Sequence, residues 1–171
     1  DKALFSALTV LETRDTLYEK LMAMLVEQLK IRFNRYAKLI NINFECGEDA
    51  SFNKKGYGLY IGNNDFGVCI YFNKKGLSDA YYGVYANNEN LFNNMIKIFH
   101  DFIIEHNFDE PDGCYPLSKW LEDEYEVWDA TVLSKIPSGE LANYIFELWK
   151  PLLDIISDNL DKIKELKMEN S

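Results

Sequence analysis

Between residues 41 and 87 the side chains change in character at every second position, and this period is the strongest constraint on the fold. In residues 57–62 Tyr, Leu and Ile alternate with Gly, Tyr and Gly, and in residues 66–72 Phe, Val, Ile and Phe alternate with Gly, Cys and Tyr. Residues 42–45 and 81–85 continue the pattern. Because successive side chains of a strand point to opposite faces, this period predicts four half-buried strands.

Short segments rich in asparagine and glycine separate the predicted strands, at residues 53–56, 62–65 and 73–76. Such residues favour tight turns, and tight turns make successive strands antiparallel. The sequence FNKKG occurs at both Phe52–Gly56 and Phe72–Gly76. We interpret the two copies as similar hairpin turns at the same end of the sheet, where they would bring four lysines together: Lys54, Lys55, Lys74 and Lys75.

The segments on both sides of the predicted sheet have helical spacing. Apolar residues recur every three or four positions over residues 16–40, and Thr16 and Glu19 have the spacing of a capping box. Residues 3–11 are predicted to form a separate short helix. Three further helices are predicted after the sheet, over residues 90–106, 117–128 and 138–163, with Ser138 capping the last and Pro151 bending it.

These patterns together predict the α+β class, with a four-stranded antiparallel β-meander packed by a long N-terminal helix and by C-terminal helices. Residues 1–171 would form a single domain that is helical over 1–40, sheet over 41–87 and helical over 90–167. A chain of 171 residues with 47% hydrophobic residues is long and apolar enough to bury a core. Since the first residue is Asp1 rather than Met, we expect an excerpt of a longer chain or a processed protein.

The net charge of −10 is concentrated in the second half of the chain. Residues 91–171 contain seven basic and seventeen acidic side chains. A field of that sign repels phosphate, so the composition argues against direct binding of nucleic acid by this segment. No window of 18 uninterrupted apolar residues predicts a membrane span. Three cysteines without CxxC spacing favour a reduced, cytoplasmic location.

No catalytic or metal-binding motif is complete in the sequence. There is no GxSxG motif and no glycine-rich phosphate loop, and the spacing of His100, His106 and Cys114 does not match a zinc site. We therefore predict no catalytic residue, no metal ligand and no cofactor within this segment. The sequence leaves open whether the whole protein is an enzyme.

An acidic run between two tryptophans is the second predicted contact surface, beside the lysine turns. Residues 122–129 contain five carboxylates, and Trp120, Tyr125 and Trp128 lie within or beside them. A solvated helix face is the simplest interpretation of the run. The alternative is a patch for a basic partner, because aromatic residues beside charges are typical of interface hot spots.

Three stretches stand out by their aromatic residues: GYGLYIGNNDFGVCIYFNKKG, the strand DAYYGVY, and YPLSKWLEDEYEVWD before the final helix. Taken in order, they resemble the C-terminal half of a bacterial family in the PD-(D/E)XK nuclease superfamily. The resemblance covers roughly residues 41–156. It implies a nuclease-like parent protein whose Mg²⁺-binding carboxylates and lysine lie upstream. Within this chain, Pro111–Asp112 and Glu165–Lys167 supply a PD and an ExK, but they lie far apart and neither is on a predicted strand.

The resemblance therefore implies a non-catalytic accessory or recognition domain. Its partner would be a protein or the upstream domain of the same chain, and nucleic acid would be reached only through the parent protein, with no membrane involved. The alternative is a stand-alone acidic protein-interaction module that binds a basic partner. One form of this alternative is a mimic of nucleic acid.

Overall fold

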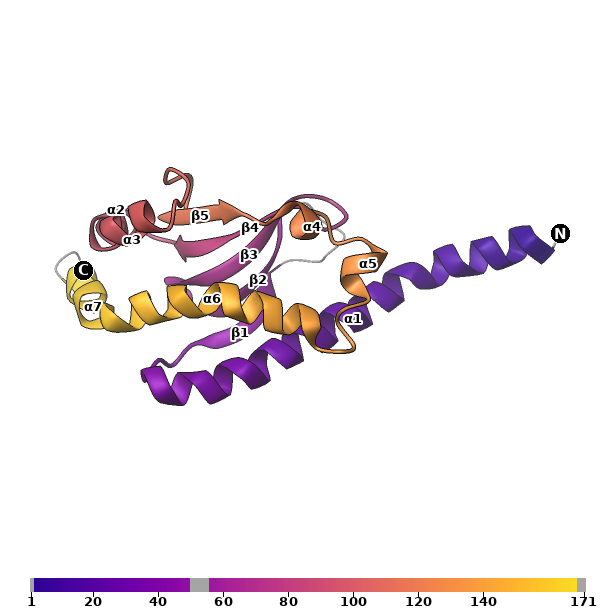
Figure 1. Ribbon diagram of the computed structural model, residues 1–171, viewed down its shortest axis with the longest axis horizontal. Helices are drawn as coiled ribbons and strands as arrows, with labels where there is room; N and C mark the ends of the chain where they lie inside the picture. Colours follow the sequence, from indigo (N-terminus) through magenta and orange to yellow (C-terminus); the bar gives the residue numbers. More distant parts are fainter. Residues whose placement is uncertain (1, 50–55, 169–171) are drawn as a thin grey trace.

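The protein is an antiparallel sheet with helices packed along one of its faces (Figure 1). The computed structural model describes residues 2–49 and 56–168. The chain begins with α1 (Lys2–Ile40), and the sheet follows with β1 (Glu45–Asp49), β2 (Tyr57–Gly62), β3 (Phe66–Lys74) and β4 (Ser78–Ala86). The remaining elements are α2 (Glu89–Ile98), α3 (His100–Glu105), β5 (Leu117–Trp120), α4 (Asp123–Glu126), α5 (Ala130–Leu133), α6 (Glu140–Asp158) and α7 (Leu160–Met168).

The sheet has five strands in the order β1-β2-β3-β4-β5, and every neighbouring pair is antiparallel. The α+β class and the meander are confirmed, but the prediction of four strands is wrong. The fifth strand comes from residues 117–120, which were predicted to be helical. It forms because Leu117 lies opposite Val84 of β4 and is fully buried, so pairing extends both the sheet and its core.

Two other predicted boundaries are corrected by the structure. The first strand begins at Glu45, after Asn41 adopts a left-handed backbone conformation (φ 51°), although Ile42 and Phe44 are buried as their alternation predicts. The N-terminal segment is one continuous helix, so Thr16 and Glu19 lie inside it and do not begin a second one. A helix of this length does not need a cap where its hydrogen-bond ladder continues.

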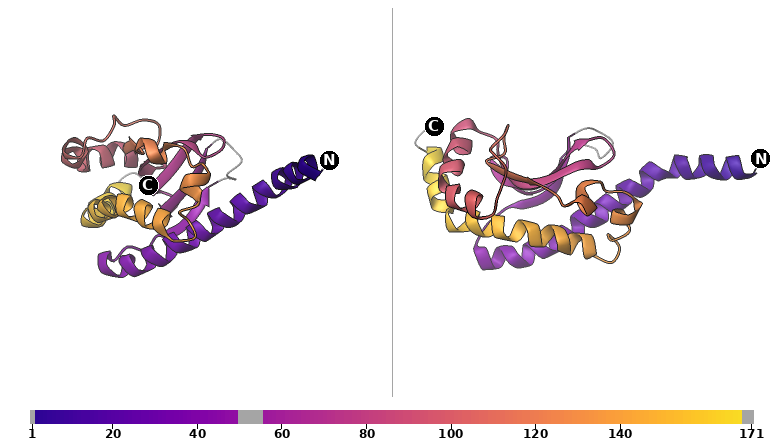
Figure 2. Two further views of the ribbon diagram at one scale, coloured as in Figure 1. Left: turned by 45° about the vertical axis from the view of Figure 1, so that its right-hand side comes forward. Right: turned by 45° about the horizontal axis from the view of Figure 1, so that its top comes forward.

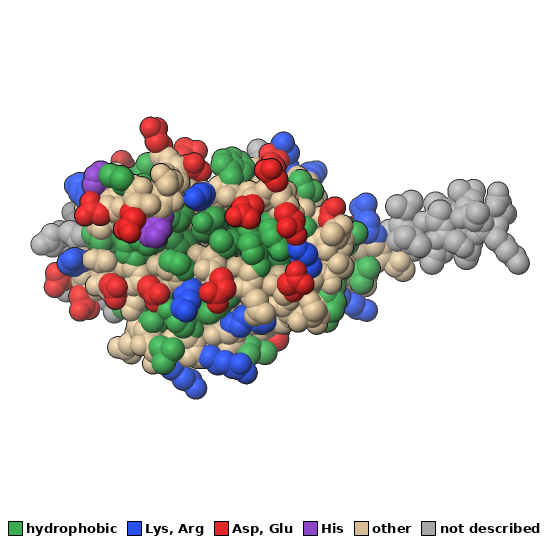
Figure 3. Space-filling view, viewed as in Figure 1, with side chains coloured by type: hydrophobic (Ala, Val, Ile, Leu, Met, Phe, Trp, Pro, Cys, Tyr) green, Lys and Arg blue, Asp and Glu red, His purple; other side chains and the backbone are tan. Residues whose placement is uncertain are grey.

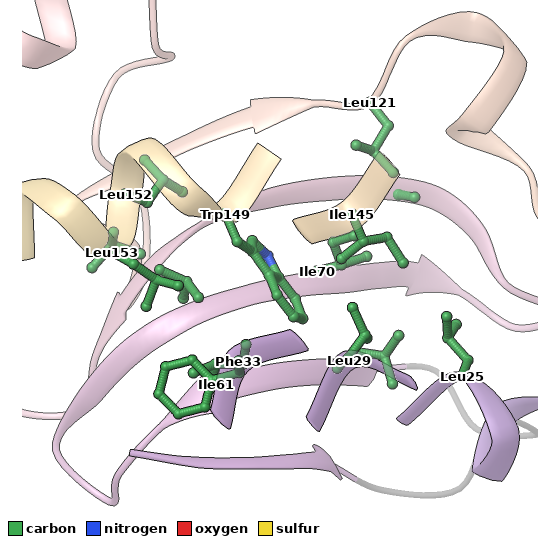
Figure 4. Close-up of a cluster of buried hydrophobic side chains, with 14 of the residues drawn as sticks. Leu25, Leu29, Phe33, Ile61, Ile70, Leu121, Ile145, Trp149, Leu152 and Leu153 are labelled. Carbon is green, nitrogen blue, oxygen red and sulfur yellow. The ribbon is translucent and has the colours of Figure 1, made fainter. Parts of the chain in front are cut away.

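One hydrophobic core lies between the sheet and the helices α1 and α6. Leu25, Leu29 and Phe33 of α1 face it from one side, and Ile61 and Ile70 face it from the sheet. Figure 4 shows Trp149 pointing from α6 into the space among these side chains. The buried aliphatic side chains of β2, β3 and β4 all project toward this core, which fixes the register of the strands.

Two of the helices predicted in the C-terminal half are each divided in two in the structure. The predicted helix over residues 90–106 divides at Phe99 into α2 and α3, and Asn88 caps α2 through hydrogen bonds to two backbone amides. The helix predicted over 138–163 divides at Asn159 into α6 and α7. Gly139, in a left-handed conformation, is the N-cap residue of α6 instead of Ser138. Pro151 lies within α6, which continues beyond it.

The second face of the sheet carries no helix within the described part of the chain. In the right-hand view of Figure 2, α1 and α6 lie below the sheet and its upper face is open. None of the described helices has both the length and the apolar content that crossing a membrane requires. We call the upper side of the sheet the open face.

Candidate functional site

The open face is built from three rows of side chains that the strand register places side by side. One row contains Glu45, Gly62, Gly67 and Tyr85. The middle row contains Gly47, Tyr60, Cys69, Gly83 and Ser118, and the third contains Asp49, Gly58, Tyr71, Tyr81 and Trp120. Not one of these positions holds Leu, Ile or Val, so the face consists of glycine, aromatic rings and a few polar groups.

The glycines of the open face make room for the tyrosine rings. A Cβ atom at Gly62 would lie 2.3 Å from the hydroxyl oxygen of Tyr85, and one at Gly67 would lie 2.9 Å from the same ring. A Cβ at Gly47 would meet the hydroxyl of Tyr60 at 2.9 Å. The rings therefore lie across neighbouring strands, covering glycine backbone that has no side chain of its own. The hydroxyl of Tyr85 donates to the carbonyl of Asn63 at 2.8 Å.

A connected group of rings crosses the sheet toward β5. The centroid of Tyr81 lies 5.5 Å from that of Tyr71 and 5.6 Å from that of Trp120. Tyr115, from the segment before β5, packs edge-on against Tyr81 with a centroid distance of 5.2 Å. Tyr60 and Tyr85 form a second pair at 6.4 Å. Apart from the tilted Tyr71–Tyr81 pair these are edge-to-face contacts, which hold aromatic side chains in fixed orientations.

Two hollows lie on the open face. The first, which we call the tyrosine cavity, has a volume of about 310 Å³ and lies between the β1 edge and Tyr115. Its walls include the rings of Tyr60, Tyr71 and Tyr85, and Glu45 and Asp49 lie at its edge on β1. The second, the Trp120 hollow, has about 260 Å³ and is bordered by three carboxylates, those of Asp109, Glu110 and Asp112.

The tyrosine cavity has two carboxylates at its edge, those of Glu45 and Asp49. The structure describes the side chains of residues 13–49, 56–163 and 165. Among them, no lysine or arginine forms an ion pair with Glu45 or Asp49. Burial raises the pKa of Tyr71 and of Tyr85, and the charge of Asp49 raises both further. Burial also raises the pKa of the Cys69 thiol, which is therefore a poor nucleophile. The cavity thus presents carboxylates and neutral hydroxyls.

The predicted lysine turns are only partly described. Lys54 and Lys55 lie outside the described residues. Lys74 ends β3 and forms an ion pair with Asp79 at 2.7 Å, and Lys75 follows it as an exposed residue of the next turn. The backbone amide of Gly56 donates to the carbonyl of Phe72 at 3.2 Å. This bond joins the residue before β2 to the end of β3, and the clustering of the four lysines stays a prediction.

The predicted aromatic segment is divided between surface and interior. Trp120 is on the open face with half of its surface exposed. Tyr125 is buried, stacks on Tyr144 with a centroid distance of 3.8 Å, and accepts a hydrogen bond from Lys135. Trp128 is 1% exposed and packs edge-on against Phe72. Of the three aromatic residues, only Trp120 offers substantial surface to a partner.

None of the residues that line the tyrosine cavity was among the predicted site residues. The alternation already assigned Tyr60, Tyr71 and Tyr85 to the same sides of their strands as the glycines. It did not indicate that the helices leave this side open. Both sides of the predicted strands carry apolar residues, so the sequence does not show which side the helices cover. The described residues contain no group of three or more His, Cys, Asp or Glu side chains placed to hold a metal ion.

Neither a protein-family model, nor a curated protein sequence, nor a solved structure matches the chain.

Proposed function

We propose that this domain is a recognition module that binds a basic segment of a partner polypeptide on its open face. The observation that carries the proposal is the contrast between the two sides of the sheet. One side holds aliphatic side chains covered by α1 and α6, and the other holds half-buried tyrosine rings over glycine together with the half-exposed Trp120. Interior packing accounts for the first side, whereas the second resembles interface cores, which are rich in tyrosine and tryptophan.

The charges around the rings favour a basic ligand. Glu45 and Asp49 border one hollow, and Asp109, Glu110 and Asp112 border the other. Arginine and lysine side chains are attracted both to carboxylates and to the faces of aromatic rings. Figure 3, which views the molecule from the side of α6, shows acidic side chains over α6 and the elements above it, interspersed with basic ones, and further basic side chains along α1. The carboxylates that border the two hollows would attract a basic partner to the open face.

We place this recognition role in a larger protein of the kind that the aromatic segments resemble. In a PD-(D/E)XK-like parent, Mg²⁺ and the hydrolytic residues would belong to the upstream part, and the present domain would bind a protein or that upstream domain. Rings can also stack on the bases of single-stranded nucleic acid, but the carboxylates beside them oppose its phosphates. A single-stranded oligonucleotide is therefore the competing ligand in the test.

Tryptophan fluorescence provides the test, because Trp128 and Trp149 are buried and Trp120 is half exposed. The probes are a peptide of alternating arginine and serine, an equally long peptide of alternating glutamate and serine, and a single-stranded oligonucleotide. We expect only the arginine peptide to quench Trp120 and to bind. In isothermal titration calorimetry, which does not depend on the Trp120 signal, we expect Trp120→Ser to weaken that binding by roughly tenfold or more, as removal of an interface tryptophan does.

Leu39→Ser is the matched control, since Leu39 is 79% exposed and lies on α1, which covers the opposite side of the sheet. It should leave binding unchanged. Equal binding of the glutamate peptide, tighter binding of the oligonucleotide, or the same loss in both variants would contradict the proposed function.

A further inference from the structure

We propose that the tyrosine cavity is the receptor for the guanidinium group of one arginine side chain in the basic segment. This inference rests on the proposed function and assigns a specific chemistry to one part of the open face. It is argued from the size of the cavity, its charge and the shape of its walls.

The size of the cavity suits one side chain. Pockets that enclose small organic ligands hold roughly 300–1,000 Å³, and the tyrosine cavity, at about 310 Å³, is at the lower limit. Gly58 and Gly62 are among its lining residues, and their lack of a side chain makes room for the rings that form its walls. Tyr71 and Tyr85 rise beside these glycines and Tyr115 closes the side toward β5.

The charge of the cavity selects a cation. Glu45 and Asp49 lie four residues apart on one strand, on the same side of the sheet, at opposite ends of the cavity edge. Their charges are not balanced by an ion pair with any cation in the part of the chain whose side chains are described. The field of Asp49 also reaches the cavity interior, since it contributes to the raised pKa of both Tyr71 and Tyr85.

The walls favour a planar cation over a compact one. A guanidinium stacks on an aromatic face and donates several hydrogen bonds in its own plane, whereas an ammonium acts as a point charge. Acceptors are available around the cavity. The side-chain nitrogen of Asn87 donates to the carbonyl of Asn64 at 2.8 Å, and its side-chain oxygen is an acceptor that pairs with no donor in the described part of the chain. The hydroxyls of the tyrosines provide further acceptors.

Three small probes distinguish these features: N-acetyl-arginine methylamide, the corresponding lysine compound, and the corresponding citrulline compound. Citrulline has the shape of arginine without its charge. Binding is followed through the backbone amide signals of Gly58 and Gly62 in NMR spectra, because both glycines line the cavity. We expect the arginine compound to shift these signals at the lowest concentration, the lysine compound to bind several times more weakly, and the citrulline compound not to bind.

Asp49→Asn and Glu45→Gln each keep the shape of the side chain and remove one charge. Each should weaken the binding of the arginine compound by about tenfold, since a hydrogen bond to a charged group is among the stronger ones. Glu110→Gln, at the Trp120 hollow, is the matched control and should have no effect on this compound. Unchanged circular dichroism in all three variants confirms that they fold alike.

The outcomes separate this inference from the proposed function. If the arginine peptide still binds through Trp120 while the capped arginine shifts neither glycine, the cavity is not the receptor and the recognition role stands. The same holds if citrulline binds as well as arginine, or if Asp49→Asn and Glu45→Gln change nothing. If the arginine peptide does not bind at all, the proposed function fails together with the inference.

Discussion

At the scale of single residues, the open face depends on pairs in which a tyrosine on one strand lies across a glycine on the next. Tyr85 illustrates the arrangement, because its ring occupies the space that a side chain at Gly62 or Gly67 would need. The glycines are therefore required by close contact and not by an unusual backbone conformation. Gly76 is different, since its φ of +79° is the left-handed conformation of a turn and nothing lies within 4 Å of its missing Cβ.

The first prediction compares these two kinds of glycine. In Gly62→Ala the new Cβ would lie 2.3 Å from the Tyr85 hydroxyl oxygen and 2.7 Å from the backbone of Gly67, so the ring and the strand must move. We expect the free energy of unfolding to fall by ~1–3 kcal/mol, as for other overpacked sites. Gly76→Ala meets no atom and should cost only about 1 kcal/mol through backbone strain. Urea denaturation of both variants measures the difference.

The two variants should also differ in their effect on the site. Displacing Tyr85 alters the tyrosine cavity, so Gly62→Ala should reduce the binding of capped arginine, whereas Gly76→Ala should not. If both substitutions cost the same free energy and neither affects binding, the ring does not lie over Gly62 as described.

At the scale of elements, α1 and α6 determine which face of the sheet is covered. The two helices contact each other as well as the sheet, and Trp149 fills the space between them. Arg32 strengthens the contact, because its Nε donates to the side chain of Asn143 at 2.7 Å and its guanidinium also donates to the carbonyl of Gly139. Fixing α6 against α1 positions both as a single layer beneath the strands.

Substitutions of Trp149 test this layer. Trp149 is fully buried and its indole N–H has no hydrogen-bond partner among the described residues. Trp149→Phe therefore loses volume but no hydrogen bond, whereas Trp149→Ala leaves a large cavity. We expect Trp149→Ala to lower the free energy of unfolding by ~3–5 kcal/mol and Trp149→Phe to cost clearly less. Chemical denaturation gives both values, and equal losses would show that the N–H, not the packing, is what matters.

An element can be predicted from the sequence when its own residues carry the pattern that defines it, and is missed when its conformation depends on a distant partner. The alternation in β2, β3 and β4 is long enough to predict the strands and to separate their two sides. β5 has only four residues, and the spacing of Leu117, Leu121, Tyr125 and Trp128 is also that of a helix. Its strand conformation depends on pairing with β4, more than thirty residues earlier, which local periodicity does not contain.

The candidate site was less predictable than the sheet for a similar reason. Tyr60, Tyr71 and Tyr85 could be assigned to a common side, but Glu45 and Asp49 join them only through the pairing of β1 with β2. Cys114 and Tyr115 reach the cavity because the backbone amide of Ala86 donates to the carbonyl of Cys114 at 2.8 Å. A tertiary contact of this kind leaves no spacing signal in the sequence.

At the scale of the whole molecule, burial of tyrosine links the fold to pH. Tyr57, Tyr81, Tyr85 and Tyr115 have pKa values raised chiefly by burial, and in Tyr57 the hydrogen bond to Glu48 raises the pKa further. Burial also raises the pKa of the Cys46 thiol to about 12. In each case the folded protein holds its proton more tightly than the unfolded chain does. All these groups therefore affect stability in the same direction.

The last prediction is a loss of stability in alkaline solution. Below pH ~10 the tyrosines are protonated in both states and stability does not depend on them. As the pH rises above ~10, the unfolded chain releases their protons and the folded protein retains them, so each such tyrosine lowers the free energy of unfolding by about 1.4 kcal/mol per pH unit. Urea denaturation between neutral and strongly alkaline pH measures this slope. Tyr57→Phe removes one such tyrosine, so it should reduce the slope by about 1.4 kcal/mol per pH unit. Phenolate absorbance provides the independent check: if all eleven tyrosines titrate in one step near pH ~10 while circular dichroism is unchanged, the rings are not buried as described.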